Sequence, residues 1–374
     1  MKKKKRGHGM LPIAASFLLF AVVIRFFSES AMQEKVMEYM NRLSENEELF
    51  RVAVSGETQY VKKNEDKEGR KLLAAESAIF QSGEREDERT HPPKKENLVV
   101  WEYTPGGERR ANTYPIENIT ISPSSEKGYV RYENVWVKND STKGIDLKWL
   151  LSAKLPFRLN GDGPHVLIVH THGSECYFPQ GREDYTLTDV ERTSDKQYNM
   201  IRIGDELAKA LKENGISVIH DRNIYDSPSY NGSYTRTLDA IGAALKKNPS
   251  IKVVIDVHRD AMTASDGTKY RTVANVNGKQ VAQMMLVMST GESGLPHPDW
   301  AENLKLAVKL QNAMQSKYKN IMRPMNLRKE RFNMHATKGS MLIEVGTSAN
   351  SVGEAIESVK LLAPELAKIL KTAK

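Results

Sequence analysis

Two hydrophobic patterns alternate along the C-terminal part of this 374-residue chain. Short runs dominated by apolar residues have the length of strands buried on both faces. Between them, apolar residues recur every three or four positions, as on one side of an amphipathic helix. The runs fall at 165–169, 216–219, 251–257, 281–288 and 341–345, and the helical segments at 199–213, 238–245, 304–318 and 352–370. The alternation predicts an α/β domain over residues 151–374, in which a mostly parallel sheet is covered by helices on both faces.

A different pattern precedes this domain. Short strand-like runs bounded by turn residues predict a small β region over residues 97–150, for which a spacer or docking module is the simplest interpretation. The runs fall at 98–103, 116–121 and 129–137. Further upstream, residues 32–53 have apolar positions near helical spacing, and residues 54–96 are polar and dense in charge. Residues 32–96 are therefore expected to form a helical and charged tether.

Residues 1–31 predict a basic cytoplasmic tail and a transmembrane anchor. The cluster Lys2 to Arg6 precedes a largely apolar stretch, Met10 to Phe27, whose 18 residues reach the lower limit for a spanning helix. Basic residues before an apolar run hold the N-terminus in the cytoplasm, so the rest of the chain is expected outside a cell membrane that it crosses once. The stretch would also suit a signal peptide cleaved near residues 28–31, but no clean cleavage motif follows it. We therefore favour an uncleaved anchor.

Charge and cysteine content narrow the chemistry. The net charge is +8, and six of these charges come from Lys2 to Arg6 and Arg25, so the remainder carries about +2. No basic surface run of the kind that binds nucleic acid is left. The single cysteine, Cys176, excludes an internal disulfide and a cysteine-rich zinc site, and we expect it to be a bystander.

Residues able to do chemistry follow three of the predicted strands. The first strand continues into HTHGSECY, which carries His172 and, three residues later, Glu175. The second continues into His258, and the third contains Glu344 within an otherwise apolar segment. Ligands of α/β sheets bind beyond the carboxyl ends of the strands, so these side chains are expected to meet.

The residue types suit a hydrolytic zinc site. A catalytic zinc takes about three protein ligands from His and carboxylate and keeps one position open for water. His172, Glu175 and His258 are predicted to be the ligands. Glu344 is predicted to be the catalytic base, which takes a proton from the water and returns it to the leaving amine. The pattern predicts hydrolysis of an amide-like or ester-like bond.

Other residues near these strand ends have less defined roles. His170 and Asp195 could each replace a ligand, and His170 could instead orient one. Arg259 and Asp260 could contact a ligand or the substrate. Asp256, whose side chain is expected on the opposite side of its strand from Val257, is interpreted as structural.

The segments HTHGSECY, NMIRIGDELAKAL, DVHRDA and LIEVGTSANS resemble the stage II sporulation protein P family of endospore-forming bacteria. That family is similar to zinc-dependent N-acetylmuramoyl-L-alanine amidases. The resemblance matches His172 and His258 to the two histidine ligands of the amidases. It also matches Glu344 to their catalytic Glu, followed as in the amidases by a Gly and by Asn350. The amidases place their middle Glu before the first helix, where this chain has Asp195. The third ligand therefore stays open between Glu175, with its carboxypeptidase-like His-x-x-Glu spacing, and Asp195 or His170.

The resemblance implies a peptidoglycan hydrolase with amidase and endopeptidase activity, acting in forespore engulfment. It also implies partnership with stage II sporulation proteins D and M. One alternative is a carboxypeptidase-like zinc peptidase, which would need a cation such as Arg259, Arg271 or Arg331 to bind a terminal carboxylate. The other is a non-enzymatic membrane scaffold.

Overall fold

The computed structural model describes residues 113–373 except residue 228. The predicted anchor at 1–31, the tether at 32–96 and the strand at 98–103 lie outside the described residues and stay predictions. Within the described part, no helix is both long enough and apolar enough to cross a membrane.

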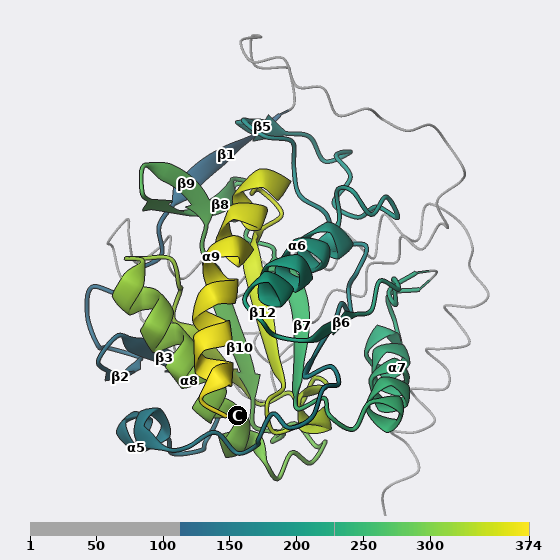
Figure 1. Cartoon of the computed structure of the whole chain (residues 1–374). Coiled ribbons are helices and arrows are strands. Elements are labelled where there is room, and N and C mark those ends of the chain that lie inside the picture. Colours follow the sequence, from purple (N-terminus) through teal and green to yellow (C-terminus); the bar gives the residue numbers. More distant parts are fainter. Residues whose placement is uncertain (1–112, 228, 374) are drawn as a thin grey trace, which may run out of the picture. The chain divides into compact units, whose positions relative to one another are not determined.

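A mixed eight-stranded sheet forms the centre of the described domain (Figure 1). Its strands β6, β4, β7 and β12 run parallel to one another, whereas β10 is antiparallel to β12 and parallel to β11 and β3. The expected α/β fold is confirmed, but the sheet contains two parallel blocks that meet antiparallel at β10 and β12, with β2 antiparallel to β3 at one edge. In sheet order, the strands are β2 (Val130–Tyr132), β3 (Val135–Asn139), β11 (Met325–Arg328), β10 (Met284–Ser289), β12 (Met341–Thr347), β7 (Val253–Asp260), β4 (Val166–Val169) and β6 (Val218–His220).

A second sheet of four strands was not predicted. Its order is β5 (Asp184–Tyr185), β1 (Tyr114–Ile119), β8 (Lys269–Val276) and β9 (Lys279–Ala282). The prediction of a single strand at 281–288 is wrong, because the chain leaves β9 at Gln283 and enters the main sheet as β10. The buried Gln283 side chain accepts from the backbone N of Ile121 at 2.8 Å and donates to its carbonyl oxygen at 3.0 Å, which fixes the crossing point.

Strands from the predicted small β region join both sheets. β1 is parallel to β8 in the second sheet, and β3 is parallel to β11 in the main sheet. These strands are therefore hydrogen-bonded to strands of residues 151–374, and the predicted boundary at 150 stays a prediction.

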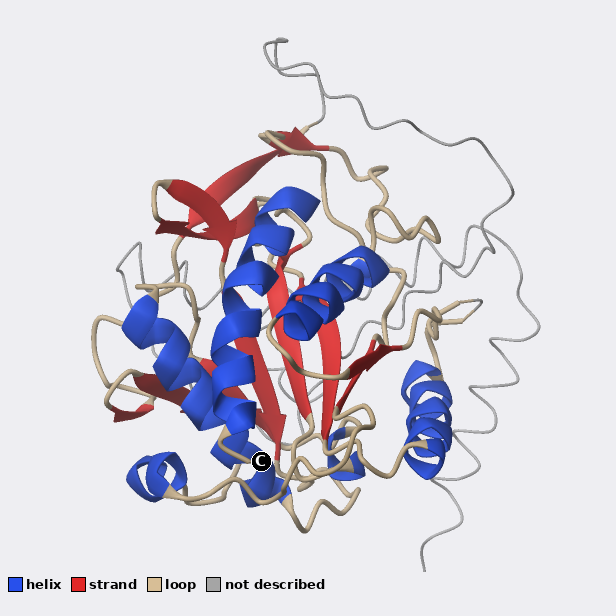
Figure 2. Ribbon diagram, in the orientation of Figure 1, coloured by secondary structure: helices blue, strands red, loops and turns tan. Residues whose placement is uncertain are grey.

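Helices cover both faces of the main sheet, as expected. On one face, α6 (Met200–Glu213), α8 (Trp300–Lys317) and α9 (Val352–Lys371) lie side by side (Figure 2). On the other face, Ile241 of α7 (Ser233–Lys247) packs against Leu167 and Val169 of β4. The neighbouring Val166 and Ile168 belong to the core beneath α6 and α9, as the alternation of side chains along a strand requires. Two short elements, α5 (Leu147–Ser152) and η1 (Met334–Ala336), complete the fold.

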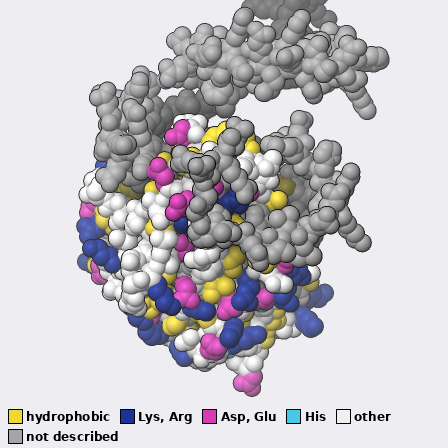
Figure 3. All heavy atoms as spheres, turned by 90° about the horizontal axis from the view of Figure 1, so that it is seen from above, with side chains coloured by type: hydrophobic (Ala, Val, Ile, Leu, Met, Phe, Trp, Pro, Cys, Tyr) yellow, Lys and Arg dark blue, Asp and Glu magenta, His cyan; other side chains and the backbone are white. Residues whose placement is uncertain are grey.

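Side-chain caps fix where two of the helices begin. Asn199 accepts from the backbone N of Ile201 at 3.0 Å and starts α6. Ser351 and Glu354 form a capping box at the start of α9. Both caps lie on the side of the sheet where β4, β7 and β12 end. On the face seen in Figure 3, Lys and Arg side chains are interspersed with Asp and Glu.

Candidate functional site

The carboxyl ends of β4, β7 and β12 bring together three predicted site residues. Glu344 of β12 is the register partner of His258 in β7. His172 lies just beyond β4, and its ring stands almost perpendicular to that of His258, with centroids 5.2 Å apart. Both histidines are buried. Parallel neighbouring strands end at the same edge, which is why residues far apart in sequence meet here.

Glu175 joins this group through a tight turn after His172. Its backbone N donates to the carbonyl oxygen of His172 at 3.2 Å. The buried carboxylate places Oε2 3.8 Å from Nδ1 of His258, and Oε2 also accepts from the backbone N of Arg259 at 3.4 Å. Oε1 lies 3.3 Å from the guanidinium of Arg192. Glu175 thus joins the turn after His172, through its backbone, to His258, through its carboxylate.

His258 lies between two carboxylates. Its Nε2 is 2.9 Å from Oδ1 of Asp256, and its Nδ1 faces Glu175. Burial disfavours a charged imidazole, but Asp256 and then Glu175 outweigh it and raise the pKa of His258 to about 9. Burial by itself would raise the pKa of Asp256. The charge of His258 and the hydrogen bonds from Thr171 outweigh burial and lower this pKa. The pocket therefore favours a positive charge at this point.

His172 has the opposite electrostatic character. Tyr230 stacks on its ring at 4.4 Å between centroids, and Tyr234 meets it edge-on at 5.5 Å. Burial, followed by the charges of His258 and Arg192, holds the pKa of His172 well below its usual range. Its Nδ1 is buried without a hydrogen-bond partner. A neutral imidazole with an unused lone pair is the form that binds a metal ion.

Glu344 is a carboxyl group that can hold a proton near neutral pH. Burial raises its pKa to about 8, with His258 acting against this shift and Asp260 and Glu175 adding to it. Its Oε2 is buried and has no hydrogen-bond partner. A carboxyl group with these properties beside a bound water would suit proton transfer in both directions.

The donor chemistry of this cluster fits zinc. Two imidazoles and one carboxylate are a common zinc ligand set, and the unpaired Nδ1 of His172 is one unused donor. The cation-favouring position of His258 agrees with that fit, since metal binding displaces protons from its ligands. However, among residues 113–373 no three His, Cys, Asp or Glu side chains are grouped so that they could already hold a metal ion.

The other two candidate ligands point elsewhere. The Nδ1 of His170 is 2.8 Å from the carbonyl oxygen of Val257, and its Nε2 is 2.8 Å from Nε2 of His220. Burial, and then His220, lower the pKa of His170 to about 3. Asp195 accepts from the backbone N of Gln197 at 2.9 Å within a surface turn. Neither side chain is hydrogen-bonded to the histidine pair.

Three more predicted site residues hold the backbone around the cluster. The guanidinium of Arg259 donates to the carbonyl oxygens of Cys176 and Glu191, at 3.0 and 2.8 Å. Asp260 forms a buried ion pair with Arg323 at 2.7 Å. Asn350 accepts from the backbone N of Thr347 at 2.9 Å and donates to Thr272 and Glu354. These side-chain contacts are structural, the backbone N of Arg259 also contacts the candidate ligand Glu175, and any contact of the three residues with substrate stays a prediction.

Burial also defines the state of Cys176. It raises the pKa of the thiol to about 12, so the group is neutral at physiological pH and unsuited to act as a nucleophile.

The sequence did not reveal several residues that surround the cluster. Asp256, interpreted as structural, pairs with His258. The alternation of side chains along β7, which puts the two residues on one face, was the signal for this contact. Arg192, Asp226 and Tyr230 come from the loops that precede α6 and α7, where no periodicity indicates spatial position.

The His170–His220 contact leads to a prediction on stability. Gly204 of α6 packs so closely against both imidazoles that a Cβ there would collide with the Nε2 atoms that bond each other. Gly204→Ala is expected to lower the free energy of unfolding by about 1–3 kcal/mol, as overpacking of cores does. Gly242→Ala in α7, where a Cβ meets open space, should be neutral or stabilising by ~0.5–1 kcal/mol. Denaturant unfolding of both variants tests this, and equal effects would contradict it.

Comparisons with known proteins agree with the sequence resemblance. The chain is 26% identical over 210 residues to stage II sporulation protein P of Bacillus subtilis (strain 168), which covers 53% of this chain and 49% of that protein. The chain thus matches only about half the length of this relative.

The solved structures that resemble this chain do so with low TM-scores and low sequence identity. An N-acetylmuramoyl-L-alanine amidase, AmiC2 of Nostoc punctiforme, is 12% identical, with a TM-score of 0.32 over 56% of this chain and 97% of that chain. The CwlD amidase from Clostridioides difficile, in complex with the GerS lipoprotein, is 14% identical, with a TM-score of 0.32 over 56% and 98% of the two chains. Values at this level establish no function.

The sequence profile of one family matches almost the whole chain. It covers residues 28–367 and includes every residue of the cluster described above. The protein therefore belongs to the stage II sporulation protein P family.

Proposed function

We propose that the protein is a zinc-dependent peptidoglycan hydrolase, an N-acetylmuramoyl-L-alanine amidase with endopeptidase activity that acts in forespore engulfment. Family membership supports the sporulation role and the cell-wall substrate. The observation that carries the reaction is the position of Glu344, the register partner of His258, whose Oε2 is buried without a hydrogen-bond partner. A carboxylate that can accept and return a proton, next to histidine and carboxylate ligands, is the arrangement that metal-assisted amide hydrolysis needs.

Each residue of the cluster has a defined part in this proposal. His172, Glu175 and His258 would hold the zinc ion, and Asp256 would keep the ring of His258 in place. Bound zinc would supply a water ligand of pKa about 7 and a polarised amide carbonyl. Glu344 would accept the proton of the attacking water as its oxygen bonds to the carbonyl carbon. It would then give that proton to the nitrogen as the carbon–nitrogen bond breaks, which yields a carboxylic acid and a free amine.

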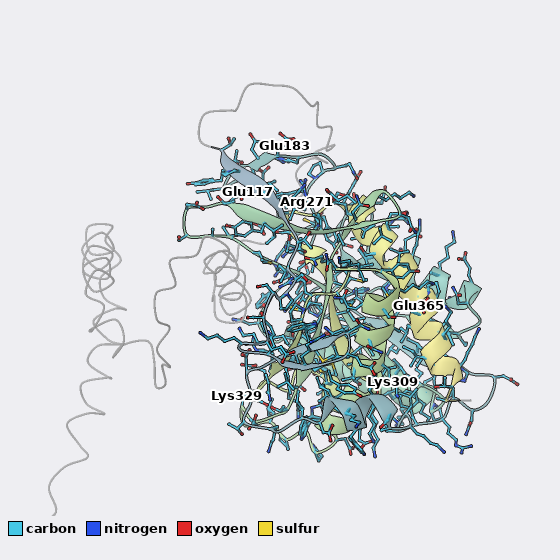
Figure 4. All side chains as sticks on the ribbon, turned by 90° about the vertical axis from the view of Figure 1, so that its left-hand side faces the viewer. Glu117, Glu183, Arg271, Lys309, Lys329 and Glu365 are labelled. Carbon is cyan, nitrogen blue, oxygen red and sulfur yellow. The ribbon has the colours of Figure 1, made fainter. Side chains whose placement is uncertain are left out.

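The carboxypeptidase-like alternative has less support. It requires a cation free to bind a terminal carboxylate, and Arg259 is committed to backbone carbonyls. Arg271 donates to the carbonyl oxygen of Ala349 at 2.9 Å and lies at the end of the molecule that carries Glu117 and Glu183 (Figure 4). Arg331, whose Nε is buried without a partner, is the remaining candidate. A scaffold without a metal would not explain why polar atoms of the cluster are buried without hydrogen-bond partners.

Anchoring and partners complete the proposal. The segment at 1–31 would hold the hydrolase domain outside the membrane, and stage II sporulation proteins D and M would act with it. These two parts rest on the sequence pattern and on the family resemblance.

Metal removal and product analysis test the proposed reaction. The protein, incubated with purified peptidoglycan, is expected to release stem peptides by cleaving the bond between the lactyl group and L-alanine. Treatment with a zinc chelator should abolish this release, and added zinc should restore it. Mass spectrometry identifies the cleaved bond. Removal of only the terminal residue would favour the carboxypeptidase. Protein that contains no zinc as prepared and shows no turnover even after zinc is added would favour the scaffold.

A further inference from the structure

A chain of charged contacts leads from a buried aspartate to the predicted ligand Glu175. Asp226 has a side chain with no exposed surface, and its Oδ2 lies 2.6 Å from Nη1 of Arg192. The Nη2 of the same guanidinium lies 3.3 Å from Oε1 of Glu175. Arg192 thus joins the loop that precedes α7 to the turn that follows β4.

Asp226 holds the guanidinium of Arg192 on the side away from Glu175. Asp226 also accepts from the backbone N and the hydroxyl of Ser174, at 3.1 and 2.6 Å, so its carboxylate cannot turn away. The guanidinium carbon of Arg192 lies 5.0 Å from the centroid of the Tyr230 ring, which also stacks on the ring of His172. A planar, forked guanidinium that is held by an ion pair and by an aromatic ring can orient a second carboxylate through its remaining N–H groups.

The contact with Arg192 gives the two carboxylate oxygens of Glu175 different partners. Oε1 is taken by Arg192, and Oε2 is left facing Nδ1 of His258. The residues also form an isolated backbone bridge, Glu175 with Arg192, so their separation is fixed by main-chain as well as side-chain contacts. Without Arg192, the carboxylate would lose the contact to Oε1 and keep only the long hydrogen bond from the backbone N of Arg259, at 3.4 Å, to hold its orientation.

We propose that Arg192 is a positioning residue that selects Glu175 as the third ligand, by holding Oε1 and directing Oε2 to the metal centre. This inference rests on the proposed zinc function. It also explains why neither Asp195 nor His170 is needed, since no comparable fork orients either of them towards the histidine pair. Arg192 acts through Glu175 and does not touch the reacting atoms in this proposal.

Zinc affinity measures this role directly. In the full chain, competition with a chromophoric chelator should show that Arg192→Ala binds zinc about 10- to 100-fold more weakly, as loss of a group that orients a ligand does. Arg192→Lys should recover part of the affinity, since lysine supplies the charge without the fork. The matched control is Arg202→Ala. It removes a similarly exposed arginine whose single ion pair, with Glu206 at 2.8 Å, lies on the surface of α6.

A double-mutant cycle separates positioning from general weakening. If Arg192 acts through Glu175, then Arg192→Ala should have no further effect on zinc affinity in a Glu175→Gln background. Arg192→Ala should melt at a lower temperature without zinc than Arg202→Ala, because it leaves the buried Asp226 without its cation, so zinc affinities are compared well below the melting transition of each variant. Wild-type zinc affinity in Arg192→Ala, or an additive effect with Glu175→Gln, would overturn the inference while leaving the zinc proposal intact. A wild-type chain that binds no zinc would overturn both.

Discussion

Replacement of Glu344 by glutamine is expected to reduce the rate of peptidoglycan hydrolysis by about 10²- to 10⁴-fold, the usual contribution of a general acid–base group. Glutamine keeps the size of the side chain but cannot accept and return a proton. Glu344 is the group whose pKa, raised by burial to about 8, suits both transfers. Zinc content should be unchanged, because Glu344 is not among the proposed ligands. Initial rates of peptide release, measured together with zinc stoichiometry, test the expectation.

The control for this variant is Glu365→Gln. Glu365 is also buried, but it lies on α9 and pairs with Lys317 and Lys368, away from the cluster. Its replacement should leave the rate within about twofold, as expected for a residue outside the reaction. A Glu344→Gln enzyme with normal zinc content and more than about a tenth of wild-type activity would contradict the assigned role.

The sequence predicts helices more closely than strand pairing. The segments expected at 199–213 and 352–370 differ from α6 and α9 by one residue at one end. Helices are set by local periodicity and by nearby caps, such as Asn199 and Ser351, which can be read from the sequence. The partition of 281–288 between two sheets depends instead on Gln283 and its distant partner Ile121. An apolar run contains no information about such a partner.

The same distinction applies to the candidate site. His172, His258 and Glu344 could be grouped from sequence because each lies at or beside the end of a parallel strand, and such ends meet at one edge. Glu175 could be placed because it is a short turn away from His172. Arg192 and Asp226 could not be placed, since they reach the cluster through loops whose course is set by tertiary contacts. The side chain of Arg259 turns to backbone carbonyls, and that of Asn350 to backbone groups and Glu354, contacts that no sequence pattern indicates.

Removal of His258 is expected to destabilise the protein even when zinc is absent. In the presence of a chelator, His258→Ala should lower the free energy of unfolding by about 3–5 kcal/mol, the usual cost of breaking a buried ion pair by removing one partner. Asp256 would remain buried without the cation that now lies 2.9 Å away. Two hydrogen bonds from Thr171 hold its carboxylate in place, so it cannot turn to solvent. Denaturant unfolding measures the loss.

The cause can be separated from simple loss of packing. Asp256→Asn, introduced into the His258→Ala background, should restore part of the stability, because the amide removes the uncompensated charge and still accepts from Thr171. His165→Ala is the matched control, since His165 is also buried but its ring is hydrogen-bonded to a carbonyl oxygen, that of Gly161 at 3.2 Å, and not to a carboxylate. His165→Ala should lower the free energy of unfolding by less than His258→Ala does. Equal losses for the two histidine variants, with no recovery from Asp256→Asn, would show that Asp256 does not depend on His258. The orienting role proposed for this carboxylate at the metal centre would then lose its physical basis.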